Sequence, residues 1–380
     1  MMYLKKKFYE YYIRPSIEFP YRMDRREFAF LFFNEDSMRR HISFKSKESL
    51  LHYLKANVPA HVYYSSAYYA SPAANTMTEK KWMGADLIFD LDADHLPGAA
   101  HMSYEESLEK VKEELIKLLS FLTDDFGFEE KNISIYFSGG RGYHCHVNDP
   151  RVIKLGSQER REIVDYVMAR GLDANQILIQ KSIYTDKFIK TIEIAPSSPG
   201  WRGRIARAII SFLHDIRKMD REKAIETLIG FEGIGEKVAG QIYDALDDER
   251  MRLIENGKID QMAAIKRLLK PLIRQIAVKL HSSTDEPVTA DIKRLIRLPG
   301  SLHGKTGFKV TKIDLNKLEE FDPLSDAIVF GNDMVDVMVE RPLKIKIKGE
   351  EFDIGKGKQK LPEYLAVFMV ARKMAIKQIL

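Results

Sequence analysis

Alternation of apolar and polar residues predicts short strands in the first part of the chain. Residues 86–94 carry apolar side chains at every second position, namely Leu87, Phe89 and Leu91. Because successive strand side chains point to opposite faces, Asp90 and Asp92 are expected to project together from the other face. Residues 25–33 predict a further buried strand.

A hairpin is predicted farther along. Residues 132–138 and 143–147 both alternate, and the Gly139-Gly140-Arg141-Gly142 segment between them forms a tight turn that needs glycine for positive φ angles. The return strand is expected to place His144 and His146 on one face and Cys145 on the other.

Apolar residues at helical spacing predict helices elsewhere. Ser103 and Glu106 form a capping-box pattern. The apolar face that follows consists of Leu108, Val111, Leu115, Leu118, Leu119 and Leu122. Residues 157–170 predict a second helix that ends before Gly171. A helix start at Pro362 and an amphipathic stretch to Leu380 close the chain.

The order of these elements predicts the fold class. Residues 204–279 are almost wholly helical in pattern, and we interpret them as a small inserted all-helical subdomain. The remainder, 1–203 and 280–380, mixes strands and helices irregularly, with strand-type sequence at 308–313 and 343–347. This order predicts an α+β fold with mixed or antiparallel sheets flanked by helices, and not a doubly wound parallel sheet.

Composition narrows the class of protein. The chain has 380 residues, 45% hydrophobic and 30% charged, which is typical of a globular protein. The net charge is only +5, so a nucleic-acid surface would have to come from local clustering. The sequence has no signal-peptide pattern and no apolar run near the ~20 residues of a membrane span. The single cysteine, Cys145, excludes an internal disulfide and a multi-cysteine zinc site. We expect a cytoplasmic protein without membrane association.

Paired aspartates are the first candidate for chemistry. Asp90 and Asp92 raise each other's pKa unless a positive group lies between them. Magnesium and manganese ions bind such oxygen ligands, together with substrate phosphates. Acidic residues also collect at strand ends and in turns, so the pair alone leaves both interpretations open.

The glycine turn is the second candidate. Residues 138–144 expose backbone N–H groups, and Arg141 and His144 add donors around them, which suits phosphate oxygens. The spacing and the Lys-Ser/Thr ending of a Walker loop are absent. An ordinary glycine-rich hairpin with an exposed arginine explains the same residues.

A third candidate covers residues 285–307. Thr289 is expected to cap a short helix whose inner face is Ile292, Leu295 and Ile296. Arg294 and Arg297 then face outward, and His303 and Lys305 follow in a loop bracketed by glycines. An amphipathic helix with a solvated basic face is the alternative.

The three segments together match the requirements of metal-dependent nucleotidyl transfer. Carboxylates hold two metal ions, which clamp the attacking 3′-hydroxyl and the leaving pyrophosphate. Basic residues hold the triphosphate and offset the charge that develops in the transition state.

In this order the segments resemble the catalytic small subunit of archaeal and eukaryotic DNA primase. The residues that carry the resemblance are Phe89–Asp94, Ser138–Cys145, Asp285–Thr289 and Leu298–Gly307, with Arg26–Phe30, Ile42–Phe44 and Leu361–Phe368. The resemblance covers essentially the whole chain apart from the helical insert. It makes 1–203 and 280–380 the primase catalytic domain.

The resemblance implies a template-directed polymerase that starts chains from nucleoside triphosphates on single-stranded DNA. It implies Mg²⁺ or Mn²⁺ as cofactor and a heterodimer with a large regulatory subunit. Asp90 and Asp92 match the family's metal-binding pair. Asp285 matches the third carboxylate, because the spacing back from His303 favours it over Asp291.

The nucleotide-binding residues also come from the resemblance. The matches to phosphate-contacting positions are Ser138, Arg141, His144, Arg297 and His303. Arg40 and Glu27 match positions near the same site, and Asp94 is expected to support the turn. Family members usually carry a zinc knuckle after the acidic strand. Here that segment holds only His95 and His101 as candidate ligands, so structural zinc is not expected.

Two further segments have alternative interpretations. Residues 231–239 look like a helix-hairpin-helix turn whose amides contact DNA phosphate, or a glycine-containing turn between packed helices. The lysines of 344–348 either follow a nucleic-acid backbone or protect an edge strand. At the level of function, the alternatives are a stand-alone repair or end-joining polymerase and a non-catalytic nucleic-acid-binding subunit.

Overall fold

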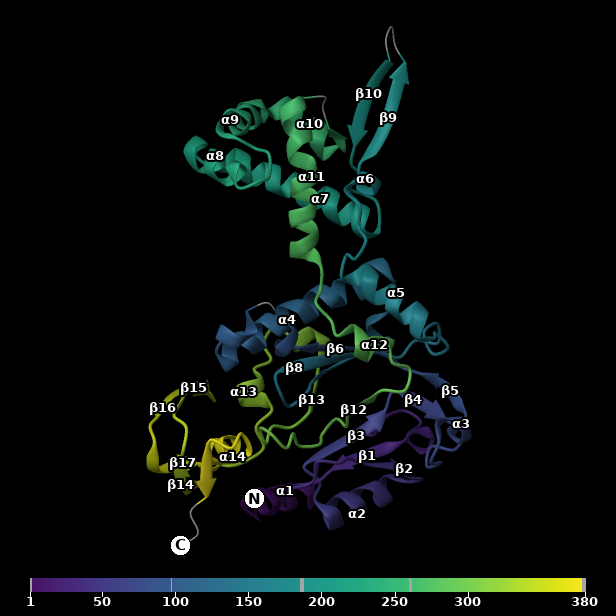
Figure 1. Ribbon diagram of the computed structural model, residues 1–380, viewed down its shortest axis with the longest axis vertical. Helices are drawn as coiled ribbons and strands as arrows, with labels where there is room; N and C mark the ends of the chain where they lie inside the picture. Colours follow the sequence, from purple (N-terminus) through teal and green to yellow (C-terminus); the bar gives the residue numbers. More distant parts are fainter. Residues whose placement is uncertain (1, 97, 185–187, 260–261, 378–380) are drawn as a thin grey trace. The chain divides into compact units, whose positions relative to one another are not determined.

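The computed structural model describes residues 2–96, 98–184, 188–259 and 262–377. Contacts between Cα atoms divide the chain into two compact units. Unit 1 comprises residues 1–116, 128–164 and 283–380, and unit 2 comprises 117–127 and 165–282. Figure 1 shows the helices and strands of both units.

The division differs from the predicted insert at 204–279. Unit 2 also takes in residues 165–203 and is not all-helical, because it holds a three-stranded sheet. The reason is a strand pairing that sequence periodicity does not reveal: Ile192 of β10 pairs with Ile259 of β11, inside the helical region. The α+β prediction itself is confirmed, and the strands described here pair antiparallel.

A four-stranded sheet in the order β12-β3-β1-β2 forms one part of unit 1. Its strands are β1 (Phe28–Leu31), β2 (Arg39–Ile42), β3 (His61–Ser65) and β12 (Leu295–Arg297). The helices α1 (Met2–Tyr12) and α2 (Lys47–Asn57) pack beside it. Phe28 and Phe30 are fully buried, so the predicted strand at 25–33 is confirmed with shorter bounds.

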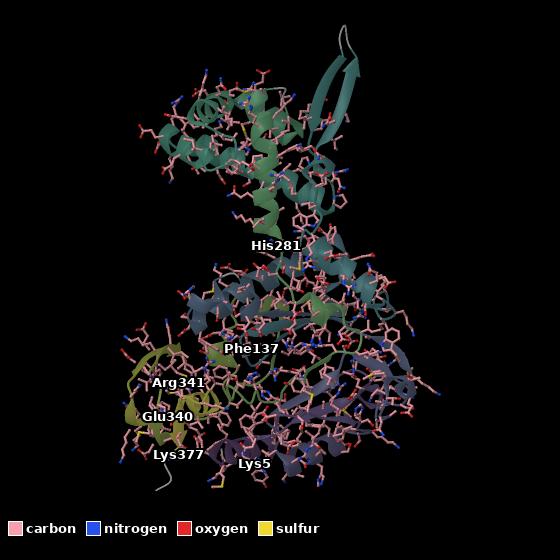
Figure 2. All side chains as sticks on the ribbon, viewed as in Figure 1. Lys5, Phe137, His281, Glu340, Arg341 and Lys377 are labelled. Carbon is pink, nitrogen blue, oxygen red and sulfur yellow. The ribbon has the colours of Figure 1, made fainter. Side chains whose placement is uncertain are left out.

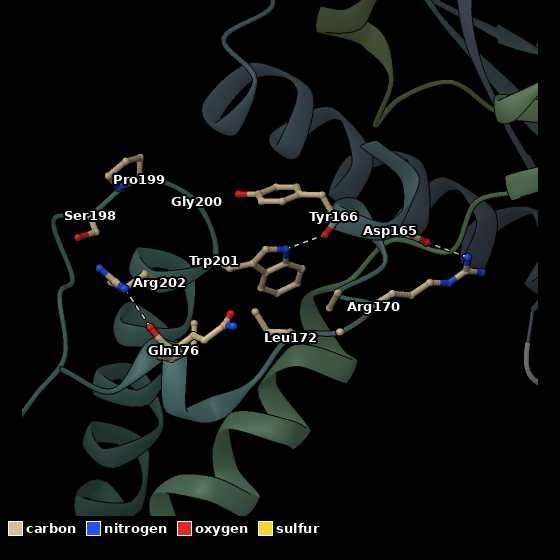
Figure 3. Close-up of a pocket in the computed structure, with 13 residues that line it drawn as sticks. Asp165, Tyr166, Arg170, Leu172, Gln176, Ser198, Pro199, Gly200, Trp201 and Arg202 are labelled. Atoms are coloured by element: carbon tan, nitrogen blue, oxygen red, sulfur yellow. Dashed lines mark hydrogen bonds and ion pairs between the residues drawn. The ribbon is translucent and has the colours of Figure 1, made fainter. Parts of the chain in front are cut away.

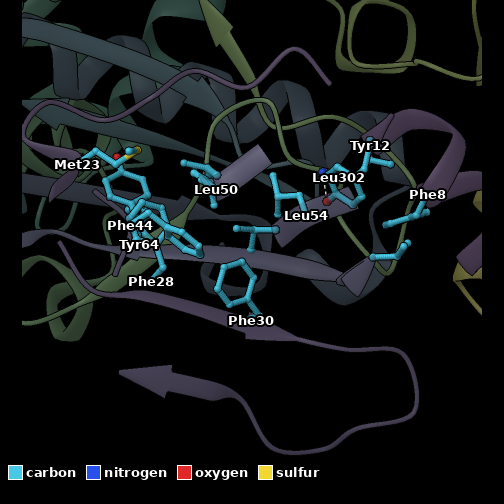
Figure 4. Close-up of a cluster of buried hydrophobic side chains, with 14 of the residues drawn as sticks. Phe8, Tyr12, Met23, Phe28, Phe30, Phe44, Leu50, Leu54, Tyr64 and Leu302 are labelled. Carbon is cyan, nitrogen blue, oxygen red and sulfur yellow. Dashed lines mark hydrogen bonds between the residues drawn. The ribbon is translucent and has the colours of Figure 1, made fainter. Parts of the chain in front are cut away.

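Aromatic residues dominate the core beneath this sheet (Figure 4). Phe28 meets Phe44 edge-on at 5.2 Å between ring centroids, and Phe30 lies 4.5 Å from Tyr53 of α2. Ile88 of β6 belongs to the same cluster, which joins the acidic strand to the first sheet.

The second sheet of unit 1 has the order β13-β7-β8-β6. Its strands are β6 (Leu87–Asp92), β7 (Ile133–Phe137), β8 (Gly142–Val147) and β13 (Thr311–Ile313). The predicted hairpin is confirmed by the pairing of Phe137 with Tyr143. Phe137, labelled in Figure 2, is fully buried and lies 5.8 Å from the Tyr143 ring and 6.4 Å from the Phe308 ring.

Helix α4 (Tyr104–Ser120) follows the acidic strand. Its predicted capping box is confirmed: Glu106 N donates to Ser103 Oγ at 3.1 Å, and Ser103 N donates to Glu106 Oε2 at 2.8 Å. Leu108 and Leu115 of its apolar face are buried. In Figure 1, α4 and α5 (Ser157–Val167) lie along one side of the second sheet.

A buried ion pair fixes the start of the acidic strand. Arg26 Nη2 donates to Asp86 Oδ2 at 2.6 Å, and both side chains are almost completely buried. Arg26 also donates to the backbone carbonyl of Ser65, at the end of β3, at 2.7 Å. Since removing one partner of such a pair costs about 3–5 kcal/mol, this contact holds β6 firmly to the first sheet.

The remaining α-helices and strands of unit 1 have at most nine residues each. They are α3 (Met77–Lys80), β4 (Ala67–Tyr69), β5 (Trp82–Ala85), α12 (Glu286–Ala290), α13 (Pro323–Asp326), β14 (Met334–Val339), β15 (Leu343–Ile347), β16 (Glu350–Ile354), β17 (Gly357–Pro362), α14 (Glu363–Ala371) and β18 (Ala375–Lys377). The predicted helix start at Pro362 is confirmed, but the amphipathic character is wrong, because α14 is buried nearly all round. Residues 378–380 lie outside the described part.

Unit 2 consists mainly of helices. Its elements are α6 (Ala174–Ile177), β9 (Ile179–Tyr184), β10 (Phe188–Glu193), α7 (Gly200–Lys218), α8 (Arg221–Ile229), α9 (Glu236–Ala245), α10 (Asp248–Glu255), β11 (Lys258–Ile259) and α11 (Ala263–Leu280). The turn at 231–239 joins α8 to α9, with Gly233 at φ 77°. Contact of this turn with DNA stays a prediction.

A cavity of about 500 Å³ opens in unit 2 beside the start of α7 (Figure 3). Trp201 lines it, with its indole N–H donating to the Tyr166 carbonyl at 2.7 Å. Among the helices described, none is both long enough and apolar enough to cross a membrane.

Candidate active site

Pairing of β6 with β8 brings the acidic strand against the histidine strand. Asp90 lies opposite His144, and Asp92 lies opposite Gly142. Leu87, Phe89 and Leu91 are buried on the other face, so the predicted alternation is confirmed. His144 Nε2 lies 3.6 Å from Asp90 Oδ1.

Asp285 is joined to the same strand through the backbone. Its N–H donates to the Asp90 carbonyl at 2.9 Å, and its carboxylate accepts from Val288 N at 3.3 Å, which caps α12. Burial raises the pKa of Asp90 to about 7, and the Asp92 and Asp285 carboxylates add to that rise. Arg294 and Arg297 act in the opposite direction but do not cancel it. The three acids therefore form one electrostatically coupled group.

The donor set fits a divalent ion that is shared with a substrate. Within the described ranges, no three His, Cys, Asp or Glu side chains are grouped tightly enough to enclose a metal ion by themselves. Magnesium is usually bound by one or two carboxylates plus substrate phosphates and water, and not by an all-protein cage. Asp90 and Asp92 supply such a pair. Burial is the main cause of the raised Asp90 pKa, and a cation would relieve the repulsion from Asp92 and Asp285 that adds to it.

Asp94 is oriented toward the glycine turn. Its carboxylate forms an ion pair with the Arg141 guanidinium, and its N–H donates to Asp92 Oδ1 at 3.0 Å. The side chain of His95 lies outside the described residues, so the expectation about zinc stays a prediction.

The glycine turn is closely packed by its neighbours. Gly139 has φ 77°, and a Cβ atom there would lie 2.7 Å from the Cβ of His303. Thr306 Oγ1 donates to the Gly139 carbonyl at 2.5 Å, and Tyr104 Oη donates to the Gly140 carbonyl at 2.5 Å. Ser138 Oγ accepts from Gly140 N at 3.3 Å. The turn is therefore held from two sides by other elements.

The predicted helix starting at Thr289 is wrong. The helix here is α12, capped by Asp285, and the chain then becomes the strand β12. The reason is long-range pairing: Ile296 pairs with Tyr64, and Arg297 with Tyr63, on β3. As a result Arg294 is exposed, but Arg297 is partly buried and does not face outward as predicted.

His303 follows β12 in a loop that packs on the glycine turn. His303 N donates to the Phe308 carbonyl at 2.8 Å, and His303 Nδ1 hydrogen-bonds with Thr306 Oγ1 at 3.1 Å. Burial, with Arg297 and His61 nearby, lowers the pKa of His303 well below its usual range. The ring is therefore neutral at pH 7.

These segments enclose a cavity of about 520 Å³, which we call the cationic cavity. Its charged and histidine lining residues are Asp92, Asp94, Arg141, Arg297, His303, Lys305, Arg372 and Lys373. Of the residues singled out from the sequence, Asp92, Arg141, Arg297 and His303 therefore meet at one place. Asp90, Asp285, Ser138 and His144 do not line the cavity. Ser138 accepts from Gly140, which does line it, whereas Asp285 and His144 contact Asp90, two residues before Asp92.

Arg40 is not brought to the cationic cavity. Its Nε donates to Oε1 of the fully buried Glu27 at 3.0 Å, and Lys80 Nζ lies 3.4 Å from the other oxygen of the same carboxylate. Burial alone would raise the pKa of Glu27, but Arg40, the His41 amide and Lys80 outweigh it, so that pKa is lowered. Arg40 stands on β2, three strands across the sheet from Arg297 on β12.

His61 is a residue of this site that the sequence did not indicate. Arg297 Nη1 donates to His61 Nδ1 at 2.6 Å, and Gly304 N donates to the same nitrogen at 3.3 Å. The His61 ring meets the His303 ring edge-on at 4.9 Å. Burial, together with Arg297 and Lys305, lowers the pKa of His61 well below its usual range, which keeps the ring an acceptor. No local sequence pattern around residue 61 predicts this contact.

An α+β fold with paired carboxylates beside a cationic cavity is typical of proteins that transfer nucleotides. Residues 89–315 match the DNA primase small subunit family. The DNA primase small subunit PriS of Methanothrix thermoacetophila is 47% identical over 385 aligned residues, covering 98% of this chain and 98% of that protein. The corresponding proteins of Methanococcoides burtonii and Methanocella arvoryzae are 46% and 43% identical, each over 98% of this chain and 97% of their own length. This chain belongs to the DNA primase small subunit family, as the sequence motifs predicted, and membership implies dependence on a divalent metal ion.

Proposed function

We propose that this chain is a primase catalytic subunit, a DNA-directed nucleotidyltransferase that makes short primers on single-stranded DNA from nucleoside triphosphates and releases pyrophosphate. The observation that carries the proposal is the coupling of Asp90, Asp92 and Asp285 beside the cationic cavity. An acidic group next to a cationic pocket is what metal-assisted phosphoryl chemistry requires, because both the ion and the triphosphate must be held together.

Asp90, Asp92 and Asp285 hold Mg²⁺ or Mn²⁺ in this proposal. Either ion, when bound, lowers the pKa of the attacking 3′-hydroxyl and neutralises charge on the leaving pyrophosphate. Asp92 lines the cavity directly, whereas Asp285 is placed by its backbone hydrogen bond to Asp90. The bond from Asp285 fixes the spacing between the third acid and the pair.

The cavity residues bind the triphosphate. Arg141 and Arg297 offer guanidinium groups to phosphate oxygens, and His303 lines the same cavity. Ser138 and His144 lie outside the cavity lining and complete the proposed set from the adjoining turn and strand. Arginine is suited to this task, since its planar fork makes two hydrogen bonds to one phosphate. Arg40 is not part of the proposed set, because its guanidinium is engaged with Glu27 outside the cavity.

The proposal includes a large regulatory subunit as partner in a heterodimer. Support comes from relatives over the whole length of the chain, which are named as small subunits. No observation favours a stand-alone repair polymerase or a non-catalytic subunit.

Nucleotide incorporation on unprimed single-stranded DNA, with magnesium or manganese, tests the proposal. Asp90→Asn and Asp285→Asn should each lower incorporation by at least about 100-fold, since an ion contributes several kcal/mol to the transition state. Asp291→Asn is the matched control, because this exposed acid lies in the same segment and its carboxylate accepts from the nearby Lys293 N at 2.8 Å. It should retain activity within about threefold.

Template binding, measured by fluorescence anisotropy, should be unchanged in Asp90→Asn. An Asp90→Asn protein that incorporates nucleotides at the wild-type rate contradicts the proposal.

A further inference from the structure

Two cations at the C-terminal end of α14 line the cationic cavity. Arg372 and Lys373 are exposed and meet the same space as Arg297 and Lys305. The sequence assigned them no role, because they lie outside the three candidate segments and just beyond the resemblance at Leu361–Phe368. Their presence there depends on how α14 packs.

Aromatic contacts hold Arg372 in place. Its guanidinium carbon lies 5.2 Å from the centroid of the Tyr104 ring and 5.3 Å from that of Phe368, within the range of a cation–π interaction. Phe368 stacks on Phe308 at 5.2 Å, and Tyr104 donates to the Gly140 carbonyl. Arg372 is therefore fixed relative to both the glycine turn and the His303 loop.

The charge of the cavity indicates the kind of ligand. Five cations line it, against two carboxylates, and one of these carboxylates, Asp94, is already paired with Arg141. In the part of the chain that the structure describes, no carboxylate forms an ion pair with Arg372 or Lys373. Such an excess of positive charge is unfavourable unless a polyanion offsets it.

We propose that Arg372 and Lys373 bind the polyphosphate of the incoming nucleoside triphosphate. Several cations in a cavity of about 520 Å³ suit a compact polyphosphate better than a template strand, whose phosphates are spread along an extended backbone. Arg372 makes directed hydrogen bonds to phosphate oxygens, and Lys373 acts as a point charge. This inference rests on the proposed function and extends its phosphate-binding set to the C-terminal helix.

Arg372→Met and Lys373→Met test the inference. Methionine keeps an apolar stem over Tyr104 and Phe368 but removes the charge, and both positions are exposed, so folding is preserved. Lys360→Met is the matched control, because this exposed lysine of β17 makes the same change in net charge outside the cavity.

Two measurements are made on the wild-type protein, the two cavity variants and the control variant. The first is binding of inorganic tripolyphosphate in metal-free buffer, by calorimetry. The second is the KM for nucleotide with kcat. Each cavity variant should weaken tripolyphosphate binding and raise KM by about 10-fold, the effect of one charge-assisted contact. The kcat should change less than threefold, because the contact is made in both ground and transition states.

Wild-type tripolyphosphate affinity in both cavity variants overturns the inference. Weakened binding of a single-stranded oligonucleotide, with tripolyphosphate binding intact, also overturns it and assigns these residues to the template. Failure of the proposed function has a different signature: wild-type protein makes no primers, while its tripolyphosphate binding still depends on Arg372.

Discussion

Burial and two neighbouring carboxylates all raise the pKa of Asp90. The pKa of this side chain rises to about 7 from an ordinary value near 4. A proton and a divalent ion relieve the same repulsion, so they compete for the site. Metal binding should therefore weaken as the pH falls below 7.

The raised pKa of Asp90 also predicts a pH-dependent stability. Because the folded state holds this proton more tightly than the unfolded state, Asp90 contributes stability that is fully present below about pH 4 and is lost as the pH rises through 7. Asp90→Asn removes that loss. In metal-free protein the variant should have a higher Tm than wild type, by an amount that grows from pH 4 to pH 7 and is constant above.

Calorimetric scans at pH 4.5, 6 and 8, with a chelator present, measure the difference. Asp36→Asn, at an exposed position between β1 and β2, serves as the control. A Tm difference that is the same at all three pH values contradicts the assignment of a raised pKa to Asp90.

His61 is predicted to position Arg297. His61→Leu removes the acceptor that holds the guanidinium, and a hydrogen bond to a charged group contributes about 1.5–3 kcal/mol. The KM for nucleotide should therefore rise by at least about 10-fold. His61→Asn, which places an amide oxygen near the position of Nδ1, should recover most of the affinity.

The control for His61 is His146→Leu. His146 is also a buried neutral histidine, but its ring nitrogen meets Tyr64 Oη and not Arg297. Thermal unfolding measures the loss of stability in both variants. If both raise KM equally, the effect of His61 is one of general folding, and the positioning role is wrong.

Local sequence predicted some of these residues and not others, for a physical reason. Asp90 and Asp92 share a face because the side chains of any strand alternate. The six residues of β6 are therefore enough to predict that these two carboxylates lie close together. His61 meets Arg297 only because β3 pairs with β12, a strand that lies more than 200 residues later in the sequence. The position of Arg372 likewise depends on the packing of α14, which no local sequence pattern predicts.

Among the elements, the glycine turn carries the sharpest packing constraint. Gly139→Ala combines a left-handed backbone, which costs an alanine roughly 1 kcal/mol, with a contact at 2.7 Å to His303 Cβ. Overpacking adds about 1–3 kcal/mol. We predict a loss of about 2–4 kcal/mol in the free energy of unfolding, and reduced nucleotide affinity because His303 moves.

Comparison with Gly127→Ala separates the effect of the His303 contact from the effect of backbone strain. Gly127 has φ 63°, but no atom from the described parts of the chain, other than its own neighbours, lies within 4 Å of the added Cβ. Its variant should lose only about 1 kcal/mol in urea titrations and keep wild-type nucleotide affinity. Equal losses in the two variants contradict the close packing of the turn against the His303 loop.

The segment after Asp285 shows where element prediction fails. Apolar residues at 292, 295 and 296 fit a helical face, yet pairing with β3 converts Leu295–Arg297 into a strand. Asp285 rather than Thr289 caps the preceding helix, because its carboxylate reaches Val288 N. Three residues are too few for periodicity to decide between a turn of helix and a strand, so the tertiary pairing decides.

At the scale of the whole molecule, the chain forms two compact units, and their boundaries could be predicted from the sequence only in part. The predicted insert, 204–279, lies within unit 2, but strands at 179–193 belong to that unit as well. Unit 1 draws its two four-stranded sheets from both sides of unit 2 in the sequence, with β12 and β13 added after unit 2. The acidic strand and the cationic cavity lie wholly within unit 1, so the proposed chemistry requires no residue of unit 2.

The central claim is that Asp90 and Asp92 bind divalent ions beside a triphosphate held in the cationic cavity. The most direct measurement is a crystal structure with manganese and a non-hydrolysable nucleoside triphosphate, with anomalous scattering used to locate the metal. We expect a manganese peak within coordination distance of both carboxylates, and phosphates in contact with Arg141 and Arg297. Manganese bound elsewhere, with these carboxylates free of metal, or a nucleotide outside the cavity, would contradict it.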